Sequence, residues 1–437
     1  MERVLIRDLK AHVGKEVTIA GWVDVRRDQG KMVFFDFRDR SGMVQGVVLP
    51  KSEAMDAAKE TRHEYVVSVT GKVNARPEKN VQEGKQNGDI ELEVLGIEIL
   101  SRAQELPFEK DTDINIDTRF DYRPFTLRSQ RDHDIFKVQA TVVDAYRQSL
   151  IAQDFTEFQA PSLVGGDAEG GAAVFKVDYF NDRTAYLATS PQFYKQIMVG
   201  AFERAFTVAR IFRAEKSATT RHLSEATCVD FEMGFIPDER EVMATLERTI
   251  RDVVEAVAKK HADVFERMGV PVPALGEKFP VLTLREAHER LGVTPEDDMT
   301  PEHERNICEW ALKEHGSDFV FITRFPTNAR AFYTMAEDGT FSRGFDLLFR
   351  GLEINSGAQR IHSYDEMVAR IKERGMDPEK FQFYLQAFKY GIPPHGGCST
   401  GIERFTMKML NLGNAKEASA FPRDMNRIDL LLSQEDA

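Results

Sequence analysis

A short basic stretch provides the clearest candidate chemistry in this 437-residue chain. Residues 211–225 read IFRAEKSATTRHLSE and concentrate Arg213, Arg221 and His222 around Glu215, although the whole chain carries a net charge of -13. The alternation in FTVARIFRAE predicts a strand with Arg213 and Glu215 on one face, followed by a loop that brings Arg221 and His222 back. Arginine pairs with phosphate oxygens in a fixed geometry, so the arrangement suits a clamp for several phosphates. A surface cluster of salt bridges would produce the same local pattern.

A second group of residues indicates a divalent cation. In the stretch GFDLLFRGLEINSGAQRIH, the pair Arg350-Gly351 predicts a two-residue hairpin turn that puts Asp346 and Glu353 on one face. Diagonal neighbours across a hairpin lie roughly 7–8 Å apart. Two carboxylates at that distance suit a hard cation such as Mg²⁺, and without one they would repel each other. Solvated surface acids are the alternative, which the apolar neighbours of the hairpin disfavour.

A glycine-rich segment followed by a helix is the third candidate, PPHGGCSTGIERFTMKML at residues 393–410. Its glycines let the backbone approach a ligand closely. The spacing in GIERFTMKML predicts a helix that buries Ile402, Phe405 and Met409 and places Arg404 near its first turn. Because a helix N-terminus favours anions, Arg404 is a candidate partner for phosphate, although helices after glycine turns are common.

The first hundred residues alternate as short strands do, and polar links separate five such segments: VTIAGWVDVR, KMVFFDFRD, MVQGVVLP, YVVSVTGKV and IELEVLGIEIL. Five strands at this spacing predict a small closed barrel of the oligonucleotide-binding kind over residues 1–104. Phe34 falls on the polar face of the second strand, where it suits a platform for stacking a nucleic-acid base better than a lone exposed aromatic. Basic and amide side chains lie near it in the pattern: Arg26, Arg27, Arg38 and Gln45.

Residues 105–134 are charged and punctuated by prolines, so we expect a hinge there. The apolar spacing in HDIFKVQATVVDAYRQSLIAQ then predicts a helix, and the remaining chain mixes strand and helix patterns. A second, larger domain over residues 135–437 would therefore carry all three candidate sites. We expect an α+β protein of two domains.

Composition disfavours several other classes of protein. The three cysteines lie far apart, without the spacing of a disulfide framework or a zinc site. The negative net charge argues against a general nucleic-acid coat protein, although the first ninety residues are nearly neutral. The start MERVLIRDLK lacks the apolar core of a signal peptide, and no segment has the roughly 18 apolar residues of a membrane helix. We therefore expect a soluble, cytoplasmic protein without membrane partners.

Taken together, the motifs resemble those of class II aminoacyl-tRNA synthetases. FRAE...RHLSE is similar to motif 2 of that family, GGCSTGIERF to motif 3, and FTEFQAPSLV to motif 1, with Pro161 at a dimer contact. The resemblance implies a homodimer whose catalytic domain is an antiparallel sheet flanked by helices. The barrel resembles the anticodon-binding domain of members that charge tRNA with aspartate, asparagine or lysine. The short spacing before the Asp346 hairpin is most similar to the compact, archaeal-like aspartate members.

The resemblance also implies a two-step reaction without a protein nucleophile. The amino acid attacks the α-phosphorus of ATP, and the terminal adenosine of tRNA then attacks the adenylate. Arg213 and Arg404 would be the catalytic residues, and Asp346 and Glu353 would hold Mg²⁺. The ATP-binding residues implied are Arg213, Glu215, Arg221, His222, Leu223, Glu353 and Arg404.

For the amino acid, the resemblance favours aspartate. The residues implied in the pocket are Glu169, Gln192, Lys195, Arg213, Tyr333, Ser356 and Arg360. A carboxylate ligand needs cations, and Lys195 and Arg360 provide two, whereas the amide of asparagine would leave a buried lysine poorly paired. The alternatives are an asparagine–tRNA ligase and a non-catalytic RNA-binding relative, although the second would have no need of an intact set of site residues.

In the barrel, the resemblance implies anticodon contacts at Arg26, Phe34, Gln45 and Pro77. Aspartate and asparagine anticodons differ only at the third base, so nearby loops decide whether one tRNA or both are charged. The proline at position 77 is similar to what is found in members that accept both tRNAs. A proline there lacks a backbone donor that could select one base edge. Asp28 differs from those members. We expect charging of tRNA(Asp) and also of tRNA(Asn).

Overall fold

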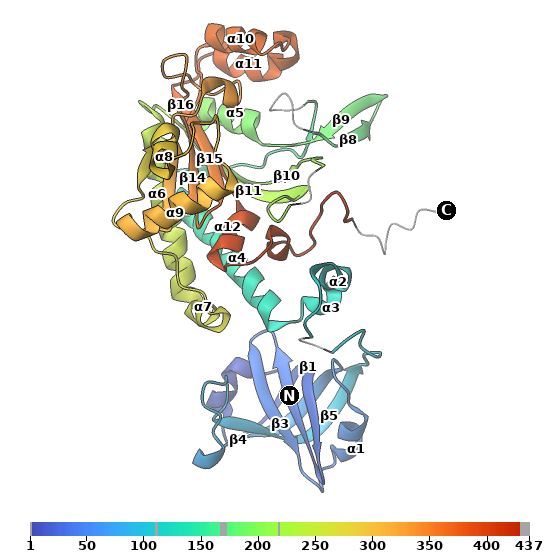
Figure 1. Cartoon of the computed structure of the whole chain (residues 1–437). Coiled ribbons are helices and arrows are strands. Elements are labelled where there is room, and N and C mark those ends of the chain that lie inside the picture. Colours follow the sequence, from blue (N-terminus) through green and yellow to red (C-terminus); the bar gives the residue numbers. More distant parts are fainter. Residues whose placement is uncertain (1, 110–111, 167–172, 217–218, 429–437) are drawn as a thin grey trace. The chain divides into compact units, whose positions relative to one another are not determined.

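The computed structural model of the chain describes residues 2–109, 112–166, 173–216 and 219–428 (Figure 1). The chain folds as two compact units, Met1–Thr112 and Asp113–Ala437. Within the described residues, no helix is long and apolar enough to cross a membrane. The three cysteines, Cys228, Cys308 and Cys398, are free and buried.

The first unit is a closed barrel of five strands in the order β1-β2-β3-β5-β4, which confirms the predicted oligonucleotide-binding barrel. The strands are β1 (Glu16–Gln29), β2 (Met32–Asp39), β3 (Gly42–Val48), β4 (Val66–Ala75) and β5 (Ile90–Ser101). The short helix η1 (Ile6–His12) precedes β1, α1 (Met55–Glu60) lies between β3 and β4, and η2 (Glu78–Asn80) lies between β4 and β5. Alternate residues of β2 fill the barrel, since Val33, Phe35 and Phe37 are buried, whereas Phe34 and Asp36 lie on the outer face and are half-buried.

The second unit is built on an eight-stranded sheet. Its strands in spatial order are β12 (Val281–Thr283), β13 (Phe319–Thr323), β14 (Gly344–Phe349), β15 (Glu353–Gln359), β16 (His395–Gly401), β11 (Glu225–Gly234), β10 (Arg204–Phe212) and β6 (Thr156–Glu157). The pairs β12–β13 and β10–β6 are parallel and the others antiparallel. A separate three-stranded sheet contains β7 (Leu163–Val164), β9 (Arg183–Leu187) and β8 (Lys176–Tyr179). The α+β expectation is confirmed.

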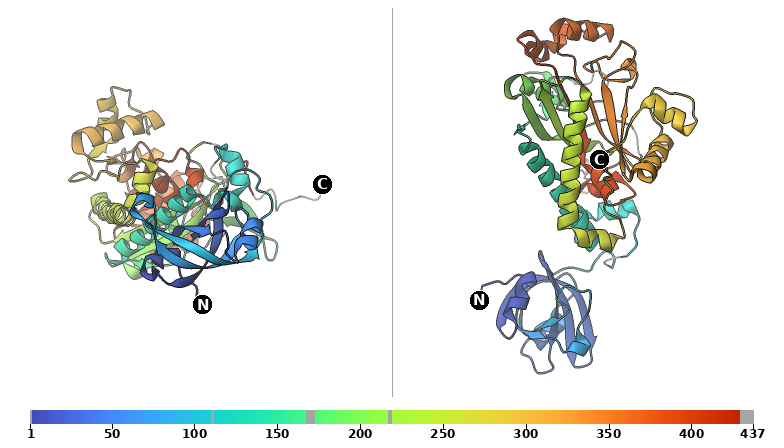
Figure 2. Two further views of the ribbon diagram at one scale, coloured as in Figure 1. Left: turned by 90° about the horizontal axis from the view of Figure 1, so that it is seen from below. Right: turned by 90° about the vertical axis from the view of Figure 1, so that its left-hand side faces the viewer.

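Helices complete the second unit, with bounds α2 (Ile116–Asp121), α3 (Arg123–Thr126), α4 (Gln130–Ile151), α5 (Gln192–Phe202), α6 (Glu239–Lys260), α7 (Ala262–Met268), α8 (Leu284–Leu291), α9 (Pro301–His315), α10 (Tyr364–Glu373), α11 (Gln382–Lys389) and α12 (Ile402–Met409). Three 3-10 turns are η3 (Thr327–Ala329), η4 (Pro378–Phe381) and η5 (Ala415–Ala418). The long helices α4 and α6 run side by side (Figure 2, right) and, with α12, pack their apolar stripes on one face of the large sheet. The main core of the unit lies in that layer.

The predicted hinge over residues 105–134 is wrong in its second half. From Ile116 onward the chain forms α2, α3 and the start of α4, with Asn115 and Ser129 as side-chain caps. Arg123 is buried there and donates to Asp132 and to the carbonyl of Ala420. The prolines and charged residues of this segment suggested a linker, but charged residues such as Arg123 and Asp132 form ion pairs and hydrogen bonds within the second unit.

Candidate active site

One row of paired residues crosses the large sheet and places polar groups on the face opposite α4 and α6. The residues paired in order are Ile322, Asp346, Ser356, Ser399, Asp230 and Thr207. Their chain neighbours, such as Phe345, Leu347, Val229 and Phe231, belong to the apolar core on the other face. Because side chains alternate across a strand, burying these neighbours in the core directs the side chains of the row to the opposite face of the sheet. Ser399 Oγ donates to Asp230 Oδ1 at 2.6 Å within the row.

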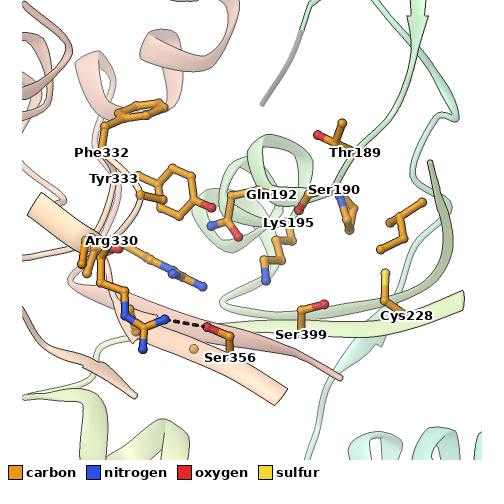
Figure 3. Close-up of a pocket in the computed structure, with 18 of the residues that line it drawn as sticks. Thr189, Ser190, Gln192, Lys195, Cys228, Arg330, Phe332, Tyr333, Ser356 and Ser399 are labelled. Carbon is orange, nitrogen blue, oxygen red and sulfur yellow. Dashed lines mark hydrogen bonds between the residues drawn. The ribbon is translucent and has the colours of Figure 1, made fainter. Parts of the chain in front are cut away.

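A cavity of about 730 Å³ opens over this row (Figure 3). Figure 3 shows Gln192 and Lys195 of α5 directed into it, together with Tyr333 from the segment that follows η3. Every described residue that the sequence predicted for the amino-acid pocket lines this cavity: Gln192, Lys195, Arg213, Tyr333, Ser356 and Arg360. Glu169, the remaining predicted member, lies outside the described residues.

Lys195 and Arg360 form a buried ionic cluster with two acids that sequence reasoning missed. Lys195 Nζ donates to Asp230 Oδ2 at 2.9 Å and to the Cys398 carbonyl at 3.1 Å, and lies 3.4 Å from Glu232 Oε2. Arg360 Nε donates to Glu232 Oε1 at 2.9 Å. Burial alone would lower the pKa of Lys195, but the two carboxylates raise it above its ordinary value. The signal that could have found them is the pair of alternating acids in the apolar strand CVDFEMG.

This cluster corrects the argument that an amide ligand would leave the lysine poorly paired. Lys195 already donates two hydrogen bonds within the protein and has a second carboxylate, that of Glu232, 3.4 Å away, so its charge is balanced before any ligand binds. The bonds of Arg360 to described residues use Nε and Nη2, on Glu232 and Gly397. Of Lys195 and Arg360, Arg360 is therefore the better placed to bind a ligand carboxylate, since none of its hydrogen bonds to the described residues uses Nη1.

A second cavity, of about 200 Å³, adjoins the first. All seven residues predicted to bind ATP line it: Arg213, Glu215, Arg221, His222, Leu223, Glu353 and Arg404. Arg213, Glu215, Glu353 and Ser356 line both cavities. The two predicted substrate sites therefore meet at Arg213.

The basic clamp differs slightly from its predicted form. Strand β10 ends at Phe212, so Glu215 lies on the following loop, although the Arg213 amide still donates to the Ser224 carbonyl at 2.9 Å. Arg221 Nη1 pairs with Glu304 of α9 at 3.1 Å, a partner that no local pattern indicated. Burial, and then the charge of Arg404, lowers the pKa of His222, which favours its neutral form.

The predicted hairpin is present with a change of register. Arg350 and Gly351 form the turn with φ of 47° and 77°, and Leu348 pairs with Glu353 as expected. A bulge between Leu347 and Leu348 then places Asp346 opposite Ser356. Asp346 is buried behind the cavities, whereas Glu353 lines both of them.

Arg330 is a further site residue that sequence reasoning missed. Its Nη2 donates to Asp346 Oδ2 at 2.7 Å, and its Nη1 donates to Ser356 Oγ at 3.2 Å. The guanidinium stacks 3.6 Å above the ring centroid of Phe325. Arg330 therefore fixes one oxygen of Asp346, and the residues it joins lie on different strands.

The acids of the hairpin fit a divalent cation. Asp346 Oδ1 is buried and has no hydrogen-bond partner among the described residues. Burial, and then the charge of Asp346, raises the pKa of Glu353 to about 7. An orphaned carboxylate oxygen beside a second carboxylate is a donor set for Mg²⁺. The described residues contain no cluster of three or more acid, histidine or cysteine ligands, so substrate oxygens would complete the coordination.

Comparison with known families agrees with this geometry. Residues 115–425 match the model of the class II tRNA synthetases (D, K and N), and residues 17–100 match an OB-fold nucleic acid binding domain. The chain belongs to the class II tRNA synthetases. It is therefore a ligase that joins an amino acid to tRNA with ATP, and this activity implies a divalent metal.

Individual relatives cover this synthetase almost completely. The aspartate–tRNA(Asp/Asn) ligase of Thermus thermophilus is 44% identical over 98% of the chain and 99% of the relative. The aspartate–tRNA(Asp) ligase of Pyrococcus horikoshii is 38% identical over 95% and 96%. Among solved structures, asparaginyl-tRNA synthetase from Pyrococcus horikoshii with asparaginyl-adenylate has a TM-score of 0.90 at 30% identity, covering 98% of this chain and 99% of the other.

The barrel of this synthetase brings together three of the four predicted anticodon residues. Phe34 lies opposite Val47 on the outer face, and Gln45 is its diagonal neighbour. Gln45 Oε1 accepts from Arg76, at 2.8 Å, and from Gln82, at 3.2 Å. Pro77 follows Arg76 and is exposed.

Two basic residues predicted near Phe34 have other positions. Arg26 pairs in register with Phe35, which places it on the opposite face, and its guanidinium donates to Asp28. Arg38 is buried and forms ion pairs with Asp24 and Glu64. Both guanidinium groups are therefore already engaged by carboxylates of the barrel unit.

Proposed function

We propose that this synthetase is an aspartate–tRNA ligase that charges both tRNA(Asp) and tRNA(Asn). It activates L-aspartate with ATP to aspartyl-adenylate and then transfers the aspartyl group to tRNA. The observation that carries the proposal is the pair of adjoining cavities that share Arg213, one lined by Lys195 and Arg360 and the other by Arg221, His222 and Arg404. Relatives at 38–44% identity that are named aspartate–tRNA ligases support the choice of amino acid.

The ATP clamp works by charge and position. Arg213, at the wall between the cavities, would hold the α-phosphate that aspartate attacks. Arg221, His222 and Arg404 would hold the β- and γ-phosphates. The ion pair between Arg221 and Glu304 must then loosen or share its guanidinium with phosphate. Glu215 and Leu223 would receive the adenine.

Asp346 and Glu353 would hold the divalent ion, which we assign as Mg²⁺. When bound, the ion supplies positive charge to the phosphate oxygens and favours the ionised form of both carboxylates. Arg330 keeps Asp346 in place from the opposite side. This role fits the orphaned Oδ1 oxygen of Asp346.

In the aspartate pocket, Arg360 would pair with the side-chain carboxylate while Lys195 holds the acids beneath it in position. Gln192, Tyr333, Ser356 and Glu169 would contact the remaining polar groups. No protein group attacks the substrate, because the α-carboxylate of aspartate is itself the nucleophile. The pocket therefore contributes orientation and neutralisation of charge.

ATP–pyrophosphate exchange, run side by side with aspartate and asparagine, tests the proposal. We expect exchange with aspartate and at least a hundredfold lower kcat/KM with asparagine. Preference for asparagine would instead identify an asparagine–tRNA ligase. Absence of exchange with either amino acid, in protein that binds tRNA, would indicate a non-catalytic RNA-binding relative.

We also propose a homodimer formed through the segment around Pro161, which is exposed in the single chain. Analytical ultracentrifugation across a concentration series measures this directly. A monomer at micromolar concentration would contradict the dimer.

A further inference from the structure

A chain of four buried polar side chains leads from the core into the amino-acid cavity. Gln192, Gln196, Tyr384 and His395 are at most 3% exposed. Gln192 Nε2 donates to Gln196 Oε1 at 3.0 Å, and the Tyr384 hydroxyl donates to the same oxygen at 2.8 Å. Gln196 Nε2 lies 2.8 Å from His395 Nε2, and His395 Nδ1 lies 2.9 Å from the Pro393 carbonyl.

The fixed end of this chain determines the direction of every bond in it. A backbone carbonyl can only accept, so Nδ1 of His395 must carry the proton that it donates to Pro393. In a neutral imidazole Nε2 is then an acceptor, and Gln196 must present its NH2 group to it. Burial lowers the pKa of His395 to about 4, which keeps the ring neutral near pH 7. This direction follows from Pro393 and does not depend on how either amide group is assigned.

The same constraint passes on to the cavity. With its NH2 group on His395, Gln196 has its Oε1 toward Gln192 and Tyr384. Gln192 must then use its own NH2 group on Gln196, which leaves its Oε1 oxygen for the cavity that it lines. An oxygen presented there accepts a hydrogen bond from a cationic N–H group, whereas an NH2 group is itself a donor and would leave that N–H group without an acceptor.

We propose that Gln196 and His395 are positioning residues that orient the Gln192 amide so that its oxygen receives the α-ammonium group of the substrate. The relay acts through Gln192 and touches no substrate atom itself. It rests on the proposed placement of aspartate in this cavity. The Tyr384 hydroxyl donates to the Gln196 oxygen, but it does not determine the orientation of that amide, because a hydroxyl can either donate or accept.

The test compares aspartate with succinate, which is aspartate without its ammonium group. Gln196→Met removes the three hydrogen bonds that Gln196 makes in the relay at nearly constant volume, so Gln192 is free to invert. In ATP–pyrophosphate exchange we expect KM for aspartate to rise at least tenfold, while KM for ATP stays within twofold. The inhibition constant of succinate should also stay within twofold, because succinate does not use the oriented oxygen.

Two further variants separate orientation from general damage. His395→Phe removes the acceptor at the far end and should repeat the selective loss, which keeps the test available if Gln196→Met does not fold. Tyr384→Phe is the matched control and should leave KM within threefold.

The outcomes distinguish this relay from the proposed activity. If the wild-type enzyme fails to exchange with aspartate, the proposed function is wrong and the relay falls with it. If the wild type is active but Gln196→Met weakens succinate as much as aspartate, the relay only maintains the shape of the pocket. An unchanged KM for aspartate in both Gln196→Met and His395→Phe would overturn the proposal outright.

Discussion

At the scale of single residues, Lys195 is a charged side chain in a buried environment. It is 1% exposed, and its charge is balanced by Asp230 and by Glu232, which also pairs with Arg360. A buried ion cluster of this kind depends on every member, because removing one leaves an uncompensated charge in a medium of low polarity. The stability and the activity of the site are therefore tied to the same four side chains.

We expect Lys195→Leu to lower kcat/KM for aspartate exchange at least a hundredfold, nearly 3 kcal/mol. It should also lower the free energy of unfolding by roughly 3–5 kcal/mol, because the buried Asp230 then loses its cation and Glu232 keeps only Arg360. Exchange kinetics and urea unfolding measure the two effects. Lys259→Leu, at an exposed position on α6, is the control and should change neither. Exchange within threefold of the wild type would show that the pocket assignment is wrong.

The buried neutral state of His395 predicts a pH dependence of stability. Its pKa is about 4 in the folded protein against an ordinary 6.5, so the unfolded chain binds the proton more readily. The free energy of unfolding should therefore fall by about 3 kcal/mol as pH decreases from 6.5 to 4. Urea unfolding of the wild type and His395→Gln at several pH values isolates this contribution, since their difference should shrink across that window. Exposed His63→Gln should behave as wild type.

At the scale of elements, the β14–β15 hairpin positions Glu353 through a turn that only certain residues can adopt. Gly351 has φ of 77°, and an added Cβ would lie 2.7 Å from Cγ and 3.0 Å from Cα of Arg305 on α9. The turn thus fits closely against the helix that also supplies Glu304 to Arg221. The geometry of the hairpin and the placement of α9 depend on the same glycine.

Gly351→Ala should destabilise the protein by roughly 2–4 kcal/mol, from the left-handed backbone and the contact with Arg305. Gly339→Ala is a matched control, because Gly339 has φ of 86° but nothing within 4 Å of an added Cβ. It should cost only about 1 kcal/mol. Equal free energies of unfolding for the two variants would mean that α9 moves aside freely.

The outer face of the barrel predicts a separation between the two steps of the reaction. Phe34→Ala should weaken aminoacylation of tRNA by roughly 1–3 kcal/mol in kcat/KM through the loss of base stacking, and leave ATP–pyrophosphate exchange unchanged. Leu49→Ala truncates another exposed apolar side chain of the barrel unit and should affect neither step. Equal damage by Phe34→Ala to exchange and to charging would argue against an anticodon role.

At the scale of the whole molecule, the two units divide recognition between them. The second unit contains the residues proposed to select the amino acid, and the barrel contains those proposed to read the anticodon. An enzyme that selects aspartate strictly can therefore still accept two tRNAs. Relatives named for tRNA(Asp/Asn) and for tRNA(Asp) alone occur at 40% and 38% identity, so overall similarity to them does not decide which tRNAs are charged.

We expect this enzyme to aspartylate transcripts of tRNA(Asp) and tRNA(Asn) with kcat/KM values within about tenfold of each other. The physical reason is that Pro77 is exposed and lacks a backbone donor, while Asp28 is engaged by Arg26. Charging of two transcripts that differ only at the third anticodon base checks the expectation. A preference above about a hundredfold, nearly 3 kcal/mol, would show that another loop residue selects the base.

Local chemistry explains why some features of this protein could be predicted from the sequence. The five alternating segments of the barrel, the Arg350-Gly351 turn and the helix containing Arg404 follow from side-chain period and turn preference within a few residues. The spacing of the basic clamp likewise predicted residues that gather around one cavity. These features depend on residues that are close together in the chain, so the spacing of residue types in the sequence is enough to predict them.

Tertiary structure decided which charges are available to substrates. Arg38 and Lys195 both suit a ligand by type, but carboxylates on other segments of the chain already engage them. The bulge that moves Asp346 opposite Ser356, and the ion pairs made by Arg330 and Glu304, also join separate segments. The pairing of a buried charge depends on which strands and helices meet around it, and that arrangement is set by the packing of the whole unit.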